Sequence, residues 1–300
     1  MSKKNNMLIL IDLDGTLLDS DSKLSERNKI AVNKMIELGN YIAIATGRNY
    51  KEAKTLTKDI NSSAIISSNG SHIVDWDGQT IADKSMDKNL AKKITNILNN
   101  YNGIRYYFTS ADEIITENKL SFLKKFILSS KSSERMTFFE KIKKAIKVYK
   151  HFNSMNINSA KNYQAYFDKN NFSIHKFFAI GKVEDIAKAK MELSNNLSEY
   201  LKITSSGDNN LEINSKNISK GKALEFILEN TKIDPIRTLA FGDSGNDVEL
   251  FDKADFSVVM ENSELKELHQ KANLKTSSNN QNGVALVLEK IIDNENFLFS

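Results

Sequence analysis

The feature that most constrains this chain is a series of short apolar segments, each of which ends in a polar motif. Residues Met7–Ile11 form the first segment, and Asp12 follows directly. The segments Tyr41–Ala45 and Ala64–Ser67 repeat the pattern, and a stretch with helical periodicity precedes each of them. Short apolar runs that alternate with helices predict buried parallel strands joined by right-handed crossovers. The sequence therefore predicts an α/β fold with a parallel sheet flanked by helices.

Charge and composition divide the 300 residues into two parts. Strand signals like those of the N-terminus return at Ile236–Phe241 and Phe256–Met260. Residues 84–215 are richer in aromatic side chains and carry 22 Lys and Arg against 13 Asp and Glu, a net charge of +9 within a chain of +4. We therefore expect an acidic domain made of residues 1–83 and 216–300, and a basic inserted domain made of residues 84–215.

The inserted segment is itself expected to mix strands and helices. Its apolar stretches predict strands at Arg105–Thr109, Lys176–Ile180 and Tyr200–Thr204, and helices at Leu120–Leu128 and Lys182–Leu197. A lysine-rich stretch, 141–150, predicts an amphipathic helix with a solvated basic face. This stretch lacks Arg and any recognisable nucleic-acid-reading motif, so we expect no nucleic-acid partner.

Two carboxylates follow the first predicted strand in the motif Asp12-Leu13-Asp14-Gly15-Thr16. Asp and Gly are common in turns, so a purely local role is one interpretation. The place of the motif favours another, because open α/β sheets bind ligands at the carboxyl ends of their strands. A carboxylate can act as a covalent nucleophile, and a second carboxyl beside it can transfer protons.

A second acidic motif, Gly242-Asp243-Ser244-Gly245-Asn246-Asp247, follows the predicted strand at 236–241. A helix N-terminus rich in Asp is the bland interpretation of this motif. The chain has no Cys and four scattered His, which excludes thiol catalysis, disulfides and Cys-built metal sites and leaves oxygen ligands for a metal. Mg²⁺ prefers such ligands.

Together the two acidic motifs resemble those of the haloacid dehalogenase superfamily. The resemblance implies a Rossmann-like core in which Asp12 is the nucleophile and Asp14 is the general acid and base. It also implies a Mg²⁺ site made by Asp12, Asp243 and the backbone carbonyl of Asp14. Asp247 is expected in that ligand shell or just outside it.

The same resemblance implies a binding site for the transferred phosphoryl group. Thr46 would donate a hydrogen bond to it, Gly47 would leave a backbone N–H free to approach it, and Lys220 would neutralise both Asp12 and the phosphoryl group. Lys222 is a competing candidate for the role of Lys220, because the two residues lie side by side in the motif Ser219-Lys220-Gly221-Lys222. The implied phosphate-binding residues are Leu13, Thr46, Gly47, Lys220 and Asn246.

Three further segments are similar to the Cof-type branch of the superfamily: Ser68-Asn69-Gly70, Val259–Ser263 and Ser278–Ala285. Glu261 stands where that branch usually has Gly, which raises a question about the backbone beside Asn262. The inserted domain lies between the Thr46 and Lys220 motifs. In this superfamily that place defines a type-2 cap, and the mixture of strands and helices indicates the α/β variety, subclass IIB.

The resemblance implies a Mg²⁺-dependent phosphatase for small phosphorylated metabolites, such as sugar phosphates or related phosphomonoesters. Two alternatives stay open: a phosphosugar mutase of the same fold, and a non-catalytic protein that binds anions or RNA. No apolar run reaches 18 residues and the first is too short for a signal peptide, so we expect no membrane partner and a cytoplasmic location. The substrate and the oligomeric state are left undetermined.

Overall fold

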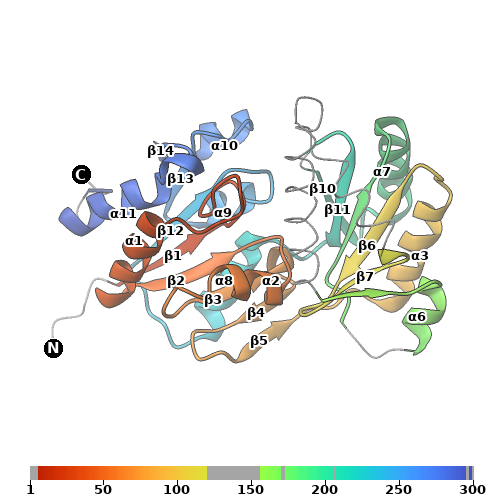
Figure 1. Ribbon diagram of the computed structural model, residues 1–300, viewed down its shortest axis with the longest axis horizontal. Helices are drawn as coiled ribbons and strands as arrows, with labels where there is room; N and C mark the ends of the chain where they lie inside the picture. The colour runs from red at the N-terminus through yellow and green to blue at the C-terminus, as the bar shows by residue number, and fades with distance from the viewer. Residues whose placement is uncertain (1–5, 120–155, 170–172, 206, 295–296, 299–300) are drawn as a thin grey trace, which may run out of the picture. The chain divides into compact units, whose positions relative to one another are not determined.

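The computed structural model describes residues 6–119, 156–169, 173–205, 207–294 and 297–298 (Figure 1). By its internal contacts the chain separates into two compact units. Met1–Lys84 and Asn217–Ser300 make the first, called the core unit below, and Ser85–Lys216 make the second, called the inserted unit. The helix expected at Leu120–Leu128 and the basic helix expected at 141–150 lie outside the described residues.

The core unit contains an eight-stranded sheet in the order β14-β13-β12-β1-β2-β3-β4-β5. Its first six strands in this order are parallel, and the hairpin β4–β5 runs antiparallel at one edge. The strands are β1 (Met7–Ile11), β2 (Tyr41–Ala45), β3 (Ala64–Ser67), β4 (His72–Val74), β5 (Thr80–Asp83), β12 (Arg237–Gly242), β13 (Phe256–Met260) and β14 (Leu274–Thr276). The predicted parallel α/β fold is confirmed.

Helices cover both faces of this sheet, which explains why its central strands are apolar throughout. Ile9 and Ile11 of β1 pack with α1 and α11, whereas Leu8 and Leu10 pack on the other face with α8, α9 and α10. Strand side chains alternate between faces, so a strand buried on both sides needs apolar residues at every position. The helices are α1 (Glu26–Glu37), α2 (Tyr50–Leu56), α8 (Lys220–Asn230), α9 (Val248–Lys253), α10 (Lys266–Lys271) and α11 (Gly283–Asp293), with short 3₁₀ turns η1 (Ser68–Gly70) and η2 (Asn279–Gln281).

The inserted unit has a six-stranded, mostly antiparallel sheet in the order β10-β11-β9-β6-β7-β8. An aromatic and aliphatic cluster packs between this sheet and its helices, with Phe108, Phe167 and Phe177 fully buried. The elements are α3 (Lys88–Asn99), β6 (Arg105–Thr109), β7 (Ile114–Thr116), β8 (Ile157–Ser159), α6 (Tyr163–Lys169), β9 (Lys176–Ile180), α7 (Val183–Leu197), β10 (Leu201–Thr204) and β11 (Asn210–Ser215).

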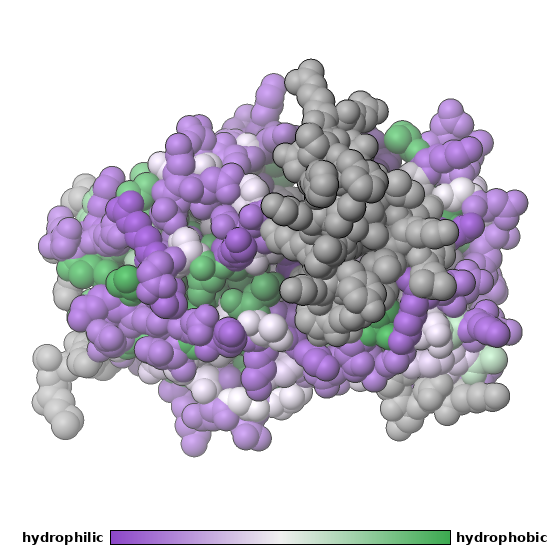
Figure 2. All heavy atoms as spheres, viewed as in Figure 1, coloured by the Kyte–Doolittle hydropathy of each residue, from purple (hydrophilic) through white to green (hydrophobic). Residues whose placement is uncertain are grey.

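On the face shown in Figure 2, hydrophilic residues cover most of the described area, and apolar residues show in small patches. Among the described residues, no helix has the length and apolar character needed to cross a membrane.

Candidate active site

The ends of three neighbouring strands form the candidate site. In the sheet β1 lies between β12 and β2, and each of the three strands ends in a motif picked out in the sequence. Asp12 follows β1, Thr46 follows β2, and Asp243 follows β12. The carboxyl ends of parallel strands lie along one edge of a sheet. Open α/β sheets bind ligands at this edge, at the point where the order of the strands reverses direction. The fold thus brings residues more than 200 positions apart in the sequence to one place.

Lys220 and two carboxylates form a buried ionic group at this edge. The Lys220 ammonium donates to Asp12 Oδ1 and to Asp247 Oδ1, each at 2.6 Å, and the Lys220 and Asp247 side chains are fully buried. Burial lowers the pKa of Lys220, but the charges and hydrogen bonds of Asp12 and Asp247 outweigh it, so its pKa lies above the ordinary value. Lys220 is therefore a permanent cation beside Asp12.

Lys222, the competing candidate, points elsewhere. Its ammonium donates to Asn217 Oδ1 at 3.0 Å. The two lysines differ because residues two apart on a helix do not share a face. The structure brings Lys220 to Asp12 and does not bring Lys222 there.

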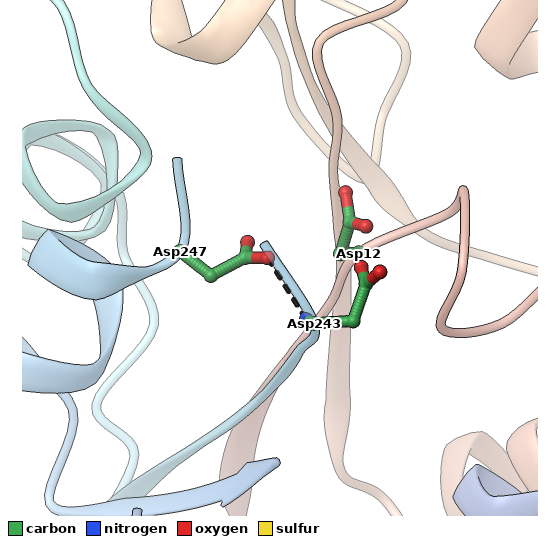
Figure 3. A group of neighbouring side chains, drawn as sticks. All are labelled: Asp12, Asp243 and Asp247. Carbon is green, nitrogen blue, oxygen red and sulfur yellow. Dashed lines mark hydrogen bonds between the residues drawn. The ribbon is translucent and has the colours of Figure 1, made fainter. Parts of the chain in front are cut away.

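Asp12, Asp243 and Asp247 form the acidic group in Figure 3. One ligand oxygen from each lies within 4.8 Å of the others. The carboxylates of Asp12 and Asp243 lie side by side, while Asp247 reaches from the start of α9 to the backbone N–H of Asp243. Three oxygen donors at this spacing could hold a divalent cation of the hard type.

The pKa values of these carboxyls support a role in binding a divalent cation. Burial raises the pKa of Asp12 well above its ordinary value; Lys220 lowers it, and the neighbouring carboxylates raise it again. Burial, followed by the charge of Asp247, raises the pKa of Asp243 to about 6. Each raised pKa means that ionising these groups together costs free energy, which a bound divalent cation would offset.

Asp247 has a second set of contacts that sets it apart from the other two carboxylates. Its Oδ2 accepts hydrogen bonds from the backbone N–H groups of Asp243 and Ser244, each at 3.1 Å, while Oδ1 accepts from Lys220. Both oxygens are thus engaged with the protein. The arrangement suits a residue that orients Lys220 and the Asp243 loop.

Glycine permits the close approach of the two acidic motifs. Gly15 has φ +80°, and a Cβ there would lie 2.2 Å from Asp243 Oδ2. A Cβ on Gly242 would lie 2.5 Å from the carboxyl carbon of Asp247. Any larger residue at either position would push a carboxylate out of the group.

Asp14 does not join this acidic group. Its side chain is half exposed and turned towards Arg48, which donates to it from Nε at 2.7 Å and from Nη2 at 2.5 Å. Arg48 also lies within 3.4 Å of the Ser22 hydroxyl. A paired contact of this kind holds a carboxylate in a defined orientation. Arg48 is a functional candidate that the sequence reasoning missed, although it directly follows Thr46 and Gly47.

The remaining phosphate-site candidates lie around the same strand ends. Thr46 is buried, and its hydroxyl oxygen accepts from the Arg48 N–H at 3.1 Å. Gly47 lies between these two residues. Asn246 Nδ2 donates to Asn69 Oδ1 at 3.0 Å. Leu13 is buried between the two aspartates of its motif, and its carbonyl accepts from two N–H groups of the following turn.

Asparagine side chains brace the loop that follows Asp14. Asn262 donates to the carbonyl of Gly15 at 2.8 Å, and Asn279 donates to that of Leu18 at 2.8 Å. Asn262 in turn accepts from the Asn279 N–H at 2.9 Å. Glu261 does not have positive φ, so this turn does not require the glycine that is usual there. The sequence resemblance pointed to both segments without assigning these contacts.

The sequence model of the haloacid dehalogenase-like hydrolase family matches residues 9–288. The chain belongs to this family. The match spans all the motifs described above and both units of the structure, and it agrees with the resemblance drawn from the acidic motifs.

Individual proteins of known sequence or structure are similar over nearly the whole chain. The 5-amino-6-(5-phospho-D-ribitylamino)uracil phosphatase YwtE of Bacillus subtilis is 30% identical over 300 residues, covering 96% of this chain and 98% of that one. The structure of a haloacid dehalogenase-like hydrolase from B. subtilis superposes with a TM-score of 0.81 at 24% identity, covering 94% of this chain and 98% of the other.

A second solved structure indicates the type of insert. A subclass IIB sugar phosphatase superposes with a TM-score of 0.71 at 16% identity, covering 95% of this chain and 99% of the other. At this identity the likeness concerns the fold alone. It confirms the expected fold, a Rossmann-like core with an inserted α/β cap of the IIB type.

Proposed function

We propose that this protein is a Mg²⁺-dependent phosphatase that hydrolyses small phosphorylated metabolites through an aspartyl-phosphate on Asp12. The observation that carries the proposal is the buried Asp12 carboxylate, held by Lys220 at 2.6 Å beside Asp243. A carboxylate fixed against a permanent cation at the ligand-binding edge of the sheet suits a nucleophile towards an anionic phosphorus centre.

The metal site of the proposal uses the residues of the acidic group. Asp12, Asp243 and the backbone carbonyl of Asp14 would hold Mg²⁺, and Asp247 would orient this shell from just outside it. The bound cation would supply positive charge that screens Asp12 from the phosphate dianion. The all-oxygen donor set and the raised pKa values of Asp12 and Asp243 support this assignment.

In the first chemical step, an Asp12 oxygen forms a bond to phosphorus and the bond from phosphorus to the leaving oxygen breaks. Asp14 gives its proton to that oxygen, which departs as an alcohol. In the second step a water oxygen bonds to phosphorus, Asp14 takes its proton, and the bond from Asp12 to phosphorus breaks. Inorganic phosphate is released, and both aspartates return to their starting states.

These proton transfers require the Asp14 carboxyl to turn away from Arg48 towards the substrate. Between turnovers the paired contact with Arg48 holds the Asp14 carboxylate, so Asp14 takes up its proton from solvent water as it turns towards the substrate and returns it to solvent at the end of the cycle. Lys220, Thr46, Asn246 and backbone N–H groups at Leu13 and Gly47 hold the phosphoryl oxygens while charge redistributes among them.

The proposed substrate class is a phosphorylated sugar, sugar alcohol or related phosphomonoester of the cytoplasm. The name of the Bacillus subtilis relative specifies a phosphate ester on a ribityl chain, which supports this class. The net charge of the inserted segment, +9, also favours small anionic substrates. We propose that this unit serves as the cap that selects among them.

The test measures phosphate release from p-nitrophenyl phosphate and a panel of phosphorylated sugars and sugar alcohols, with Mg²⁺ and with EDTA. We expect turnover only with Mg²⁺, and a loss of about a thousandfold or more in Asp12→Asn. Asp77→Asn, an exposed change in the β4–β5 turn, is the control and keeps full activity. Asp12→Asn with wild-type Mg²⁺-dependent activity would overturn the proposal, and transfer of phosphate to a second sugar hydroxyl would favour the mutase.

A further inference from the structure

The turn η1 after β3 is built in a costly backbone conformation that the proposed chemistry leaves unexplained. Ser68, Asn69 and Gly70 have φ values of 49°, 61° and 108°. Ser68 is fully buried, and Asn69 is 4% exposed. A side-chain-bearing residue in this region is strained, and such strain persists only where surrounding contacts hold it. Two in succession in a buried turn call for a reason.

The contacts of Asn69 reach two of the phosphate-site motifs. Its backbone N–H donates to the carbonyl of Thr46 at 2.9 Å, and its side-chain Oδ1 accepts from Asn246 Nδ2 at 3.0 Å. The neighbouring Ser68 N–H donates to the carbonyl of Arg48 at 2.7 Å. The turn is therefore bound to both sides of the place where the phosphoryl group is proposed to lie.

The side-chain contact fixes the orientation of the Asn246 amide. Ser244 Oγ donates to Asn246 Oδ1 at 2.8 Å, while Nδ2 donates to Asn69. An amide has two distinct ends, and a partner at each end selects one of its two orientations. Among the described residues, loss of Asn69 would leave the Ser244 contact as the side-chain partner of this amide.

The turn also contacts the Ser219–Lys222 motif. A Cβ on Gly70 would lie 2.7 Å from the carbonyl oxygen of Ser219, the residue that caps α8. Gly70 thus lets the turn pack against the end of α8 that carries Lys220. Because its backbone is left-handed, this three-residue turn can contact Thr46, Asn246 and the start of α8.

We propose that Asn69 is a positioning residue for the phosphoryl group: it holds the Asn246 amide and the end of β2 in the geometry that binds phosphate oxygens. The inference rests on the proposed function and extends it to a residue outside the motifs of Asp12, Thr46, Lys220 and Asp243. Asn69 acts through Asn246 and Thr46.

The test uses Asn69→Gly, Asn246→Ala and the double variant. Glycine adopts φ 61° without strain, so Asn69→Gly deletes the amide and keeps the turn. We measure the Kd of inorganic phosphate with Mg²⁺ by isothermal titration calorimetry, kcat and KM for p-nitrophenyl phosphate, and Tm. Asn69→Gly is expected to raise the phosphate Kd and the KM about tenfold without a lower Tm.

The double variant shows whether the effect of Asn69 on phosphate binding depends on Asn246. If Asn69 acts through Asn246, adding Asn69→Gly to Asn246→Ala changes the phosphate Kd by less than about twofold. Asn282→Gly is the matched control, because Asn282 has φ 60° and lies at the start of α11. It is expected to leave Kd, kcat and KM unchanged.

Three outcomes would overturn the inference: a wild-type phosphate Kd in Asn69→Gly, a tenfold effect of Asn69→Gly that persists in the Asn246→Ala background, or an equal effect of Asn282→Gly. Failure of the proposed function would look different, since the unaltered protein would then release no phosphate from any ester on the panel. Phosphate binding is measured without turnover, so the two failures are told apart.

Discussion

The two units both pack helices against a sheet and bury apolar side chains, but they differ in what else lies buried. The core unit buries Lys220 with Asp12 and Asp247 at one edge of its sheet. The inserted unit buries a cluster of rings between sheet and helices, where the Phe108 ring centroid lies 5.1 Å from that of Phe167 and 5.5 Å from that of Phe177. Apolar packing stabilises a fold, whereas clustered buried charge lowers stability unless partners are in place.

The difference indicates how the molecule divides its tasks. Both units gain stability from apolar packing, but the core unit also gives up some stability to hold three buried charged groups together, ready for a ligand. Proteins commonly show this opposition between stability and function at their sites. Substitutions in each unit can test it, taken here from the largest expected change in the free energy of unfolding to the smallest.

Phe108→Ala is expected to lower the free energy of unfolding of the inserted unit by about 4 kcal/mol, because it leaves a cavity among four packed rings. Urea denaturation measures the change. Phe178→Ala, on the other face of the same sheet and only half buried, is the control and should cost less. An equal loss in the free energy of unfolding for both variants would show that the ring cluster adds no more stability than the partly buried ring of Phe178 does.

Lys220→Met is expected to lower the free energy of unfolding by about 3 kcal/mol at pH 7.5, because it leaves two buried carboxylates without their cation. Turnover should be lost as well. Lys222→Met, two residues along the same helix, is the control and should stay within about 0.5 kcal/mol of the unaltered protein. Urea denaturation with and without Mg²⁺ checks both, and similar losses would contradict the assignment of Lys220.

Asp243→Asn is expected to raise the free energy of unfolding, unlike the two substitutions above. The pKa of Asp243 in the folded protein is about 6, above its ordinary value, so the folded state holds this proton more tightly than the unfolded state does. The resulting contribution to the free energy of unfolding is complete below about pH 4 and is lost as the pH rises through 6. In the absence of Mg²⁺ the variant should therefore be more stable by about 2 kcal/mol at pH 8, with no difference at pH 4.

The same variant also tests the metal site. Mg²⁺ should raise the Tm of the unaltered protein at pH 8 and progressively less below pH 6, where the carboxyls hold protons. It should raise the Tm of Asp243→Asn little at any pH. Thermal unfolding followed by circular dichroism measures this, and an equal Mg²⁺ shift in both proteins would rule out Asp243 as a ligand.

Helix capping should contribute equally to the stability of the two units, and its loss should give the smallest change in the free energy of unfolding. Ser25 accepts from the Asn28 N–H at 3.1 Å at the start of α1, and Asp87 accepts from the Asn89 and Leu90 N–H groups at the start of α3. Ser25→Ala and Asp87→Ala should each cost about 1 kcal/mol in urea denaturation and leave kcat and KM unchanged. A change in kcat from either would show that these caps also support the site.

Much of the strand pattern could be predicted from apolar runs. The predicted strands at 7–11, 41–45, 105–109 and 176–180 coincide with β1, β2, β6 and β9. The strands β7, β8, β11 and β14 were missed. They are short or carry Asn, Ser and Lys, so their pairing depends on neighbours in the sheet rather than on local pattern.

The candidate site was predicted less evenly. Asp12 and Asp243 follow buried strands, and a strand end places its next residue at the edge of the sheet whatever else the chain does. The partner of the Asp14 side chain was not foreseen, because Arg48 reaches it from the end of the neighbouring strand. The link from Asn69 to Asn246 spans 177 residues and leaves no trace in the local sequence.

The sequence by itself determined the α/β class, the places where strands end and the kinds of side chain found there, because these depend on residues close together in the chain. Only the tertiary structure decided which side chains meet. Lys220 contacts Asp12 across 208 positions, and that contact exists because α8 packs closely at Gly70 and Gly221, where a Cβ would strike neighbouring backbone. A local pattern cannot select one lysine among many, since the choice depends on how distant elements pack.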